Sequence, residues 1–156
     1  MEHEKYMREA LREASYAAAE DEVPIGAVII CRGRIVGKGH NMTEKLNDPT
    51  AHAEMIAITA ATEALGGKYL NDCTLYVTVE PCPMCAGAIM NARIKKLYIG
   101  AMEPKFGSVG SKVNLLEDVV FNHNVEVEKG VCEEESVKLL QSFFKELRTR
   151  NKERKK

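Results

Sequence analysis

The sequence of 156 residues contains no long apolar run, and its longest apolar stretches have only the length of a β-strand. A helix that spans a bilayer needs about 20 apolar residues, so we expect no membrane partner. The N-terminus, MEHEKYMREA, also lacks the apolar segment of a secretory signal. These two absences predict a cytoplasmic protein.

Cysteine is scarce, with five residues, and an odd number leaves one without a partner. Cys82 and Cys85 form a C-x-x-C motif, whereas Cys31, Cys73 and Cys132 are scattered. A disulfide framework needs an oxidising compartment and a paired set of cysteines, so the sequence argues against one. We expect Cys31 and Cys73 to pack as buried apolar groups on strands, and we assign no role to Cys132.

The chain has almost no excess of charge, since its formal net charge is −1. This argues against indiscriminate nucleic-acid binding, and we expect no DNA partner. However, residues 145–156 carry seven basic and two acidic residues, so this segment holds +5 and the other 144 residues hold −6. A basic segment on an acidic body is typical of a phosphate-contacting arm, although a solvated terminus has the same composition.

The length suits one domain, which we place at residues 1–150, followed by a basic C-terminal tail at 151–156. Apolar spacing predicts helices over residues 3–20, 52–65, 83–93 and 133–150, and a short helix over 113–118. β-Branched runs predict strands over residues 25–30, 34–39, 74–79, 96–101 and 125–127, with loops over 40–50 and 102–112. Strands that alternate with helices imply an α/β fold in which a mixed five-stranded sheet has helices on both faces, in three α/β/α layers.

Two short motifs, His52-Ala53-Glu54 and Pro81-Cys82-Pro83-Met84-Cys85, contain the residue types of a metal site. His52, Cys82 and Cys85 are zinc ligand types, and three protein ligands leave the fourth position of Zn²⁺ for water, as in a catalytic site. Both motifs lie at predicted helix N-termini, whose partial positive charge favours thiolates. We therefore expect two helix starts to face one zinc ion.

Glu54 is the expected catalytic residue beside this ion. Two thiolates donate more charge than imidazoles and make the zinc ion a weaker Lewis acid, so a nearby base helps to activate the water. Glu54 would take a proton from a zinc-activated water and pass protons to a ring nitrogen and to the leaving amine. The pattern H-x-E…P-C-x-x-C is typical of zinc-dependent deaminases that act on nucleobases.

A structural zinc site and a redox pair are the alternatives for these residues. A structural site would need a fourth protein ligand, and none of the remaining candidates repeats the close ligand spacing; they are His3, His40, His123, Cys31, Cys73 and Cys132. A redox pair would not explain His52 and Glu54.

Four segments of the chain resemble the bacterial tRNA-specific adenosine deaminase family, whose fold is cytidine-deaminase-like. The four blocks are NDPTAHAE at 47–54, TLYVTVEPCPMCAGA at 74–88, GAMEPKFGSVGS at 100–111 and NHNVEV at 122–127. Phe143-Phe144 followed by basic residues is also similar. The resemblance covers residues 4–150, and the third block and the tail favour the tRNA enzymes over other zinc deaminases.

This resemblance implies hydrolytic deamination of adenosine to inosine at the wobble position of a tRNA anticodon, by a homodimer with one Zn²⁺ per subunit. It implies that Asn41 and the Ala53 backbone contact the flipped base. It also implies that tRNA is bound by Glu103, Lys105, Phe144 and the basic tail, including Arg148.

The chain departs from the family at two positions in the third block. Glu103 stands where the family more often has aspartate, and Phe106 replaces a smaller residue. The Pro-Cys-Pro-Met-Cys motif also occurs in guanine deaminases, so a free-base purine deaminase remains an alternative. A zinc-stabilised RNA-binding module is the non-enzyme alternative, and Glu54 argues against it because a structural zinc needs no base.

Overall fold

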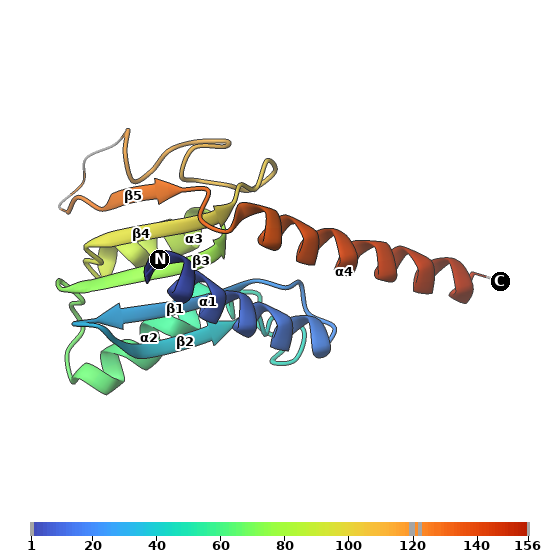
Figure 1. Ribbon diagram of the computed structural model, residues 1–156, viewed down its shortest axis with the longest axis horizontal. Coiled ribbons are helices and arrows are strands. Elements are labelled where there is room, and N and C mark those ends of the chain that lie inside the picture. The colour runs from blue at the N-terminus through green and yellow to red at the C-terminus, as the bar shows by residue number, and fades with distance from the viewer. Residues whose placement is uncertain (1, 119–120, 122, 156) are drawn as a thin grey trace.

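The computed structural model describes residues 2–118, 121 and 123–155, and its centre is a five-stranded mixed sheet (Figure 1). The strands are β1 (Gly26–Cys31), β2 (Arg34–His40), β3 (Cys73–Val79), β4 (Lys96–Ala101) and β5 (Glu126–Lys129). Their order is β2-β1-β3-β4-β5. β1 runs antiparallel to both β2 and β3, whereas β3, β4 and β5 are parallel. The predicted mixed sheet is confirmed.

Helices cover both faces of this sheet. α2 (Ala53–Leu65) and α3 (Pro83–Asn91) pack on one face, and α1 (Glu2–Ala19) and α4 (Glu133–Arg154) contact the other (Figure 1). α4 begins beside β4 and runs well past the edge of the sheet. The predicted α/β/α layering is therefore confirmed.

Strand side chains divide between the two layers with the period of two that a pleated sheet imposes. Ala27 and Ile29 of β1 are fully buried on the face covered by α2 and α3, while Val28 packs on the other face, where α1 lies. In the same way, Leu97 of β4 faces α2 and α3, and Tyr98 faces α1. Burial on both faces explains why these strands appear in the sequence as continuous apolar runs.

Two glycines of β2 allow α2 to lie close to the sheet. A Cβ at Gly39 would overlap the Ala53 carbonyl oxygen, and a Cβ at Gly37 would overlap the Ala57 carbonyl oxygen. Glycine therefore sets the distance between β2 and the first two turns of α2. This close packing fixes the start of α2, where His52 and Glu54 lie.

The structure corrects the helix that we expected at residues 113–118. This segment forms a turn after a bridge between Val109 and Asn114. The Asn114 Oδ1 atom accepts a hydrogen bond from the Glu117 backbone N–H at 3.0 Å, and the Asn114 amide donates to the Glu117 carboxylate. Six residues give too few helical hydrogen bonds to offset helix nucleation, so the side-chain turn is formed instead.

Two further expectations differ in detail, and a third falls outside the described residues. α4 continues to Arg154, so residues 151–154 of the expected tail are helical. Cys73 is buried as expected, but Cys31 is only half-buried. Asn122, which belongs to the fourth resembling block, lies outside the described residues.

Among the described residues, no helix is both long and apolar enough to cross a membrane.

Candidate active site

His52, Cys82 and Cys85 form the one group of possible metal ligands in the described part of the chain. Their ligand atoms all lie within 4.8 Å of one another. The Nδ1 atom of His52 is 3.6 Å from the Cys82 sulfur and 3.5 Å from the Cys85 sulfur. A tetrahedral zinc ion with ordinary bond lengths would separate a nitrogen and a sulfur ligand by about 3.6 Å, so these residues fit zinc.

The candidate ligands are placed by two helix starts, as the sequence predicted. His52 is the N-cap of α2, and Cys82 is the N-cap of α3, with Pro83 in the first turn. Both N-cap residues have extended backbones, and neither side chain caps its own helix. Their carbonyls instead begin the helical ladder, since Ile56 N–H donates to His52 and Ala86 N–H donates to Cys82. The imidazole and the thiol are thereby left free to bind a cation.

The two thiols differ in acidity. The Cys85 thiol and the His52 ring donate to the Cys82 sulfur, which lowers the pKa of Cys82 to about 4. The same contact with Cys82 raises the pKa of Cys85, and burial acts in the same direction. The pair therefore favours one thiolate over two, because adjacent negative charges repel. A cation between the sulfurs would offset that repulsion.

Glu54 lies two residues after His52, in the first turn of α2, and only 3% of its surface is exposed. Burial raises the pKa of its carboxyl to about 7. An acid with a pKa near neutrality is well suited to proton transfer at physiological pH. Among the groups beside the metal ligands, Glu54 is therefore the candidate proton carrier.

A cavity of about 450 Å³ opens beside these residues. Its walls include His52, Glu54 and Cys82 together with four of the residues that we expected to contact substrate, namely Asn41, Ala53, Glu103 and Phe144. Val23, Ile25, Val79 and Pro83 add apolar surface. A partly apolar cavity with a few polar groups is the usual form of a site for a planar base.

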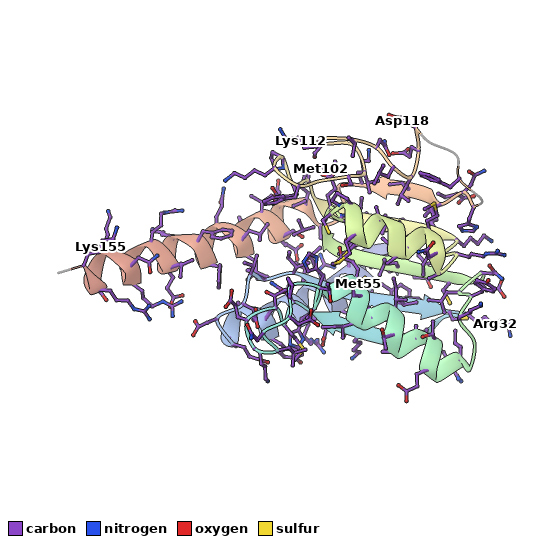
Figure 2. All side chains as sticks on the ribbon, turned by 180° about the vertical axis from the view of Figure 1, so that it is seen from behind. Arg32, Met55, Met102, Lys112, Asp118 and Lys155 are labelled. Atoms are coloured by element: carbon purple, nitrogen blue, oxygen red, sulfur yellow. The ribbon has the colours of Figure 1, made fainter. Side chains whose placement is uncertain are left out.

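The other two expected contacts, Lys105 and Arg148, lie in a neighbouring groove. This groove runs between the loop after β4 and α4, and it shares Glu103 and Phe144 with the cavity. Figure 2 shows Met102, another residue of the groove wall, near the base of α4, and Lys155 at the far end of that helix. The groove would therefore suit a single-stranded nucleic-acid backbone that runs from the cavity towards the basic half of α4.

Sequence analysis missed two buried carboxylates that hold the loops around the cavity. Glu22 accepts backbone hydrogen bonds from Glu44 at 3.0 Å and Lys45 at 2.7 Å. Glu80 accepts backbone hydrogen bonds from Glu103, Val109 and Ser111. For Glu80, the sequence did contain an indication, because a charged residue directly follows the apolar residues of β3.

The histidines that we left out of the metal site are engaged elsewhere. His40 lies at the end of β2, with Nδ1 3.2 Å from the Glu13 carboxylate. His123 contacts the Ile94 carbonyl oxygen at 2.8 Å. His3 lies between the Tyr76 and Tyr98 hydroxyls. None of the three belongs to the group of ligand atoms around His52.

Comparison with known proteins identifies the family. A family model described as MafB19-like deaminase matches residues 1–148. The tRNA-specific adenosine deaminase of Bacillus subtilis (strain 168) is 49% identical over 149 residues, which cover 96% of this chain and 92% of that protein.

Solved structures agree. A structure from studies of adenosine-to-inosine editing by tRNA:A34 deaminases has a TM-score of 0.84 and 48% identity, covering 87% of this chain and 99% of the other. The guanine deaminase of Bacillus subtilis is less similar, with a TM-score of 0.64 and 35% identity, covering 78% of this chain and 88% of the other. The chain belongs to the family of bacterial tRNA-specific adenosine deaminases.

Proposed function

We propose that this protein converts adenosine to inosine at the wobble position of a tRNA anticodon by hydrolytic deamination. The observation that carries the proposal is the meeting of His52, Cys82 and Cys85 with buried Glu54 in the wall of one cavity. Close identity to a tRNA-specific adenosine deaminase over nearly the whole chain supports adenosine in tRNA as the substrate. The resemblance also supports a cytoplasmic homodimer.

The proposed cofactor is one Zn²⁺ per subunit, held by His52, Cys82 and Cys85. When bound, zinc supplies a Lewis acid that lowers the pKa of a water molecule. The chain's own part is proton transfer and positioning. The Glu54 carboxylate takes one proton from the attacking water and gives it to a ring nitrogen of adenine. It then takes the second proton from the hydroxyl added to the ring and gives it to the amine, which leaves as ammonia.

The cavity holds the target base out of the anticodon loop. Asn41 lies in the cavity wall, where its side chain also hydrogen-bonds the backbone of Val23 and Thr43, and the Ala53 backbone lies beside the proposed metal ligands. Loop bases can be extruded from a single-stranded segment at a cost of a few kcal/mol, so a cavity for one base is compatible with an RNA substrate. Lys105 and Arg148 of the neighbouring groove, together with the other basic residues of α4, then contact the RNA phosphates.

A free-base guanine deaminase is the second candidate, because a guanine deaminase is 35% identical to this chain. The groove beside the cavity and the basic half of α4 favour RNA, since a free base needs no phosphate contacts. A zinc-stabilised RNA-binding module without activity is the third, and it leaves the buried carboxyl of Glu54 unexplained.

The test is incubation of the zinc-loaded protein with an anticodon stem-loop that carries adenosine at the wobble position. Nuclease digestion and chromatography measure inosine, while free guanine and cytidine are incubated in parallel. Inosine from the stem-loop supports the proposal. Deamination of guanine without inosine formation would transfer the assignment to a purine-base deaminase, and no product from any substrate would favour a binding module.

A further inference from the structure

Glu80 is a buried carboxylate that directly precedes the metal-binding Pro81-Cys82 segment. Only 4% of its surface is exposed. Its Oε1 atom accepts hydrogen bonds from the Glu103 N–H at 2.9 Å and from the Ser111 hydroxyl. Its Oε2 atom accepts from the Val109 N–H at 2.9 Å and the Ser111 N–H at 3.0 Å. All four hydrogen bonds therefore go to one loop, residues 103–111.

The 103–111 loop is fitted around this carboxylate. A Cβ at Gly107 would overlap the Glu80 side chain, so glycine permits the close approach. The loop is also joined to the same segment through the backbone, because the Ser108 N–H donates to the Pro81 carbonyl at 2.9 Å. Hydrogen bonds to an ionised acceptor are stronger than neutral ones, so Glu80 is the principal polar support of the loop.

The same loop forms one side of the cavity and of the groove. Glu103 and Phe106 lie at the cavity wall, and Glu103 and Lys105 line the groove. Phe106 is 65% exposed, so little packing holds it in place other than the loop backbone. The positions of Glu103, Phe106 and Lys105 beside the cavity and the groove thus depend on the contacts that Glu80 makes.

We propose that Glu80 is a positioning residue that holds the 103–111 loop beside the cavity and thereby controls binding of the RNA around the target adenosine. This proposal rests on the proposed function. Glu80 itself also borders the cavity, but its carboxylate is occupied by four donors. Its effect on substrate is therefore indirect.

Replacement by glutamine keeps the size of the side chain and removes half of its acceptors. In Glu80→Gln, one oxygen becomes an amide donor that faces two groups of the loop that also donate. In Ser111→Ala, only the hydroxyl contact is lost, and the three backbone contacts of Glu103, Val109 and Ser111 remain. Tyr76→Phe is the matched control, because it removes a part-buried hydrogen bond to His3 on the other face of the sheet, where α1 packs.

Steady-state kinetics on the stem-loop test the role. Glu80→Gln should raise KM by about tenfold or more, as expected when buried N–H groups lose an acceptor, and should change kcat by less than about threefold. Its zinc content should equal that of the wild type. Ser111→Ala should raise KM less, and the double variant should be no worse than Glu80→Gln alone, because both substitutions act through the same loop.

Three results would overturn the proposal. A fall in kcat at unchanged KM would place Glu80 in the chemical step. Independent, additive effects of Glu80→Gln and Ser111→Ala would mean that Glu80 does not act through the loop. An equal rise in KM for Tyr76→Phe, at a comparable loss of melting temperature, would reduce the effect to general destabilisation.

Limited trypsin digestion measures the loop without any substrate. Cleavage after Lys105 should be faster in Glu80→Gln than in the wild type, and unchanged in Tyr76→Phe. Equal cleavage rates in Glu80→Gln and wild type would contradict the proposal. If the wild type forms no inosine, the proposed function fails, and the digestion still decides whether Glu80 holds the loop.

Discussion

The His52 Nδ1 atom lies 3.5 Å from the Cys85 sulfur, although 33 positions separate the two residues in the sequence. The contact exists because α2 and α3 begin side by side at the same end of the sheet and present their N-terminal residues to each other. Each helix start brings partial positive charge to the site. The ligand cluster is therefore a product of the fold rather than of any local segment.

Loss of a ligand should release the metal. Cys85→Ser should lower the zinc content from about one ion per chain to below about 0.1, because a neutral hydroxyl is a much poorer zinc ligand than a thiolate. Elemental analysis of protein dialysed against a weak chelator measures this. Cys73→Ser is the matched control, since Cys73 is also a buried thiol and lies outside the cluster. Equal zinc in both variants would contradict the assignment.

Glu54→Gln should keep its zinc and lose activity. The amide cannot take a proton from water, and general acid–base catalysis contributes about 100- to 10,000-fold. We expect kcat to fall by about 100-fold to 10,000-fold or more. Zinc content and melting temperature should stay close to those of the wild type. Inosine formation under single-turnover conditions is the measurement. Turnover within a few-fold of the wild type would remove Glu54 from the mechanism.

The packing of α2 on β2 makes a prediction about stability and metal binding together. Gly39→Ala places a methyl group against the Ala53 carbonyl, so α2 must shift at the point where it carries His52. Overpacking of this kind costs about 1–3 kcal/mol. We expect a lower melting temperature and weaker zinc binding, measured by thermal unfolding and by competition with a chromogenic chelator.

Gly67→Ala is the control for this substitution, because a Cβ at Gly67 would meet no heavy atom within 4 Å. Its melting temperature should be close to that of the wild type. If Gly39→Ala left both stability and zinc affinity unchanged, the proposed link between β2 and the metal site would be wrong.

The sequence was enough to predict most elements, because burial on both faces gives the central strands continuous apolar runs and the helices a regular spacing. It was also enough to place His52 and Cys82 at helix starts. It could not indicate the roles of Glu22 and Glu80. Their partners lie 22 to 31 residues away in loops, and only the folded backbone brings those N–H groups to the carboxylates.

The C-terminal end of α4 could not be predicted from the sequence either. Residues 151–154 are polar, so no apolar spacing predicts that they are helical, yet they continue α4 as its last turn. The Arg150 guanidinium contacts the Asp21 carboxylate at 2.9 Å, which ties this part of α4 to the end of α1. The expected phosphate-contacting arm, residues 145–156, is thus helical up to Arg154.

Removal of residues 148–156 should weaken RNA binding and make it less sensitive to salt. The segment carries six basic residues and one acidic residue. Each phosphate contact to single-stranded RNA contributes about 0.7 to the slope of log affinity against log salt, so the slope should fall by several tenths or more. Fluorescence anisotropy with a labelled stem-loop at several salt concentrations measures both quantities.

Two comparisons make that experiment decisive. Zinc content should not change, because the deleted residues do not belong to the ligand cluster. Lys68→Gln removes an exposed basic residue in the turn after α2 and should leave affinity and slope unaltered. Identical salt dependence of the truncated and full-length chains would show that α4 does not contact phosphates.

The most direct test of the account compares kcat/KM for an anticodon stem-loop with wobble adenosine and for free guanine, using one zinc-loaded preparation. The account predicts a preference for the stem-loop of about 100-fold or more, because a site built for one base discriminates against another by its buried polar contacts. Inosine should form at the wobble position alone. Equal or higher kcat/KM for guanine would contradict the assignment of this chain as a tRNA deaminase.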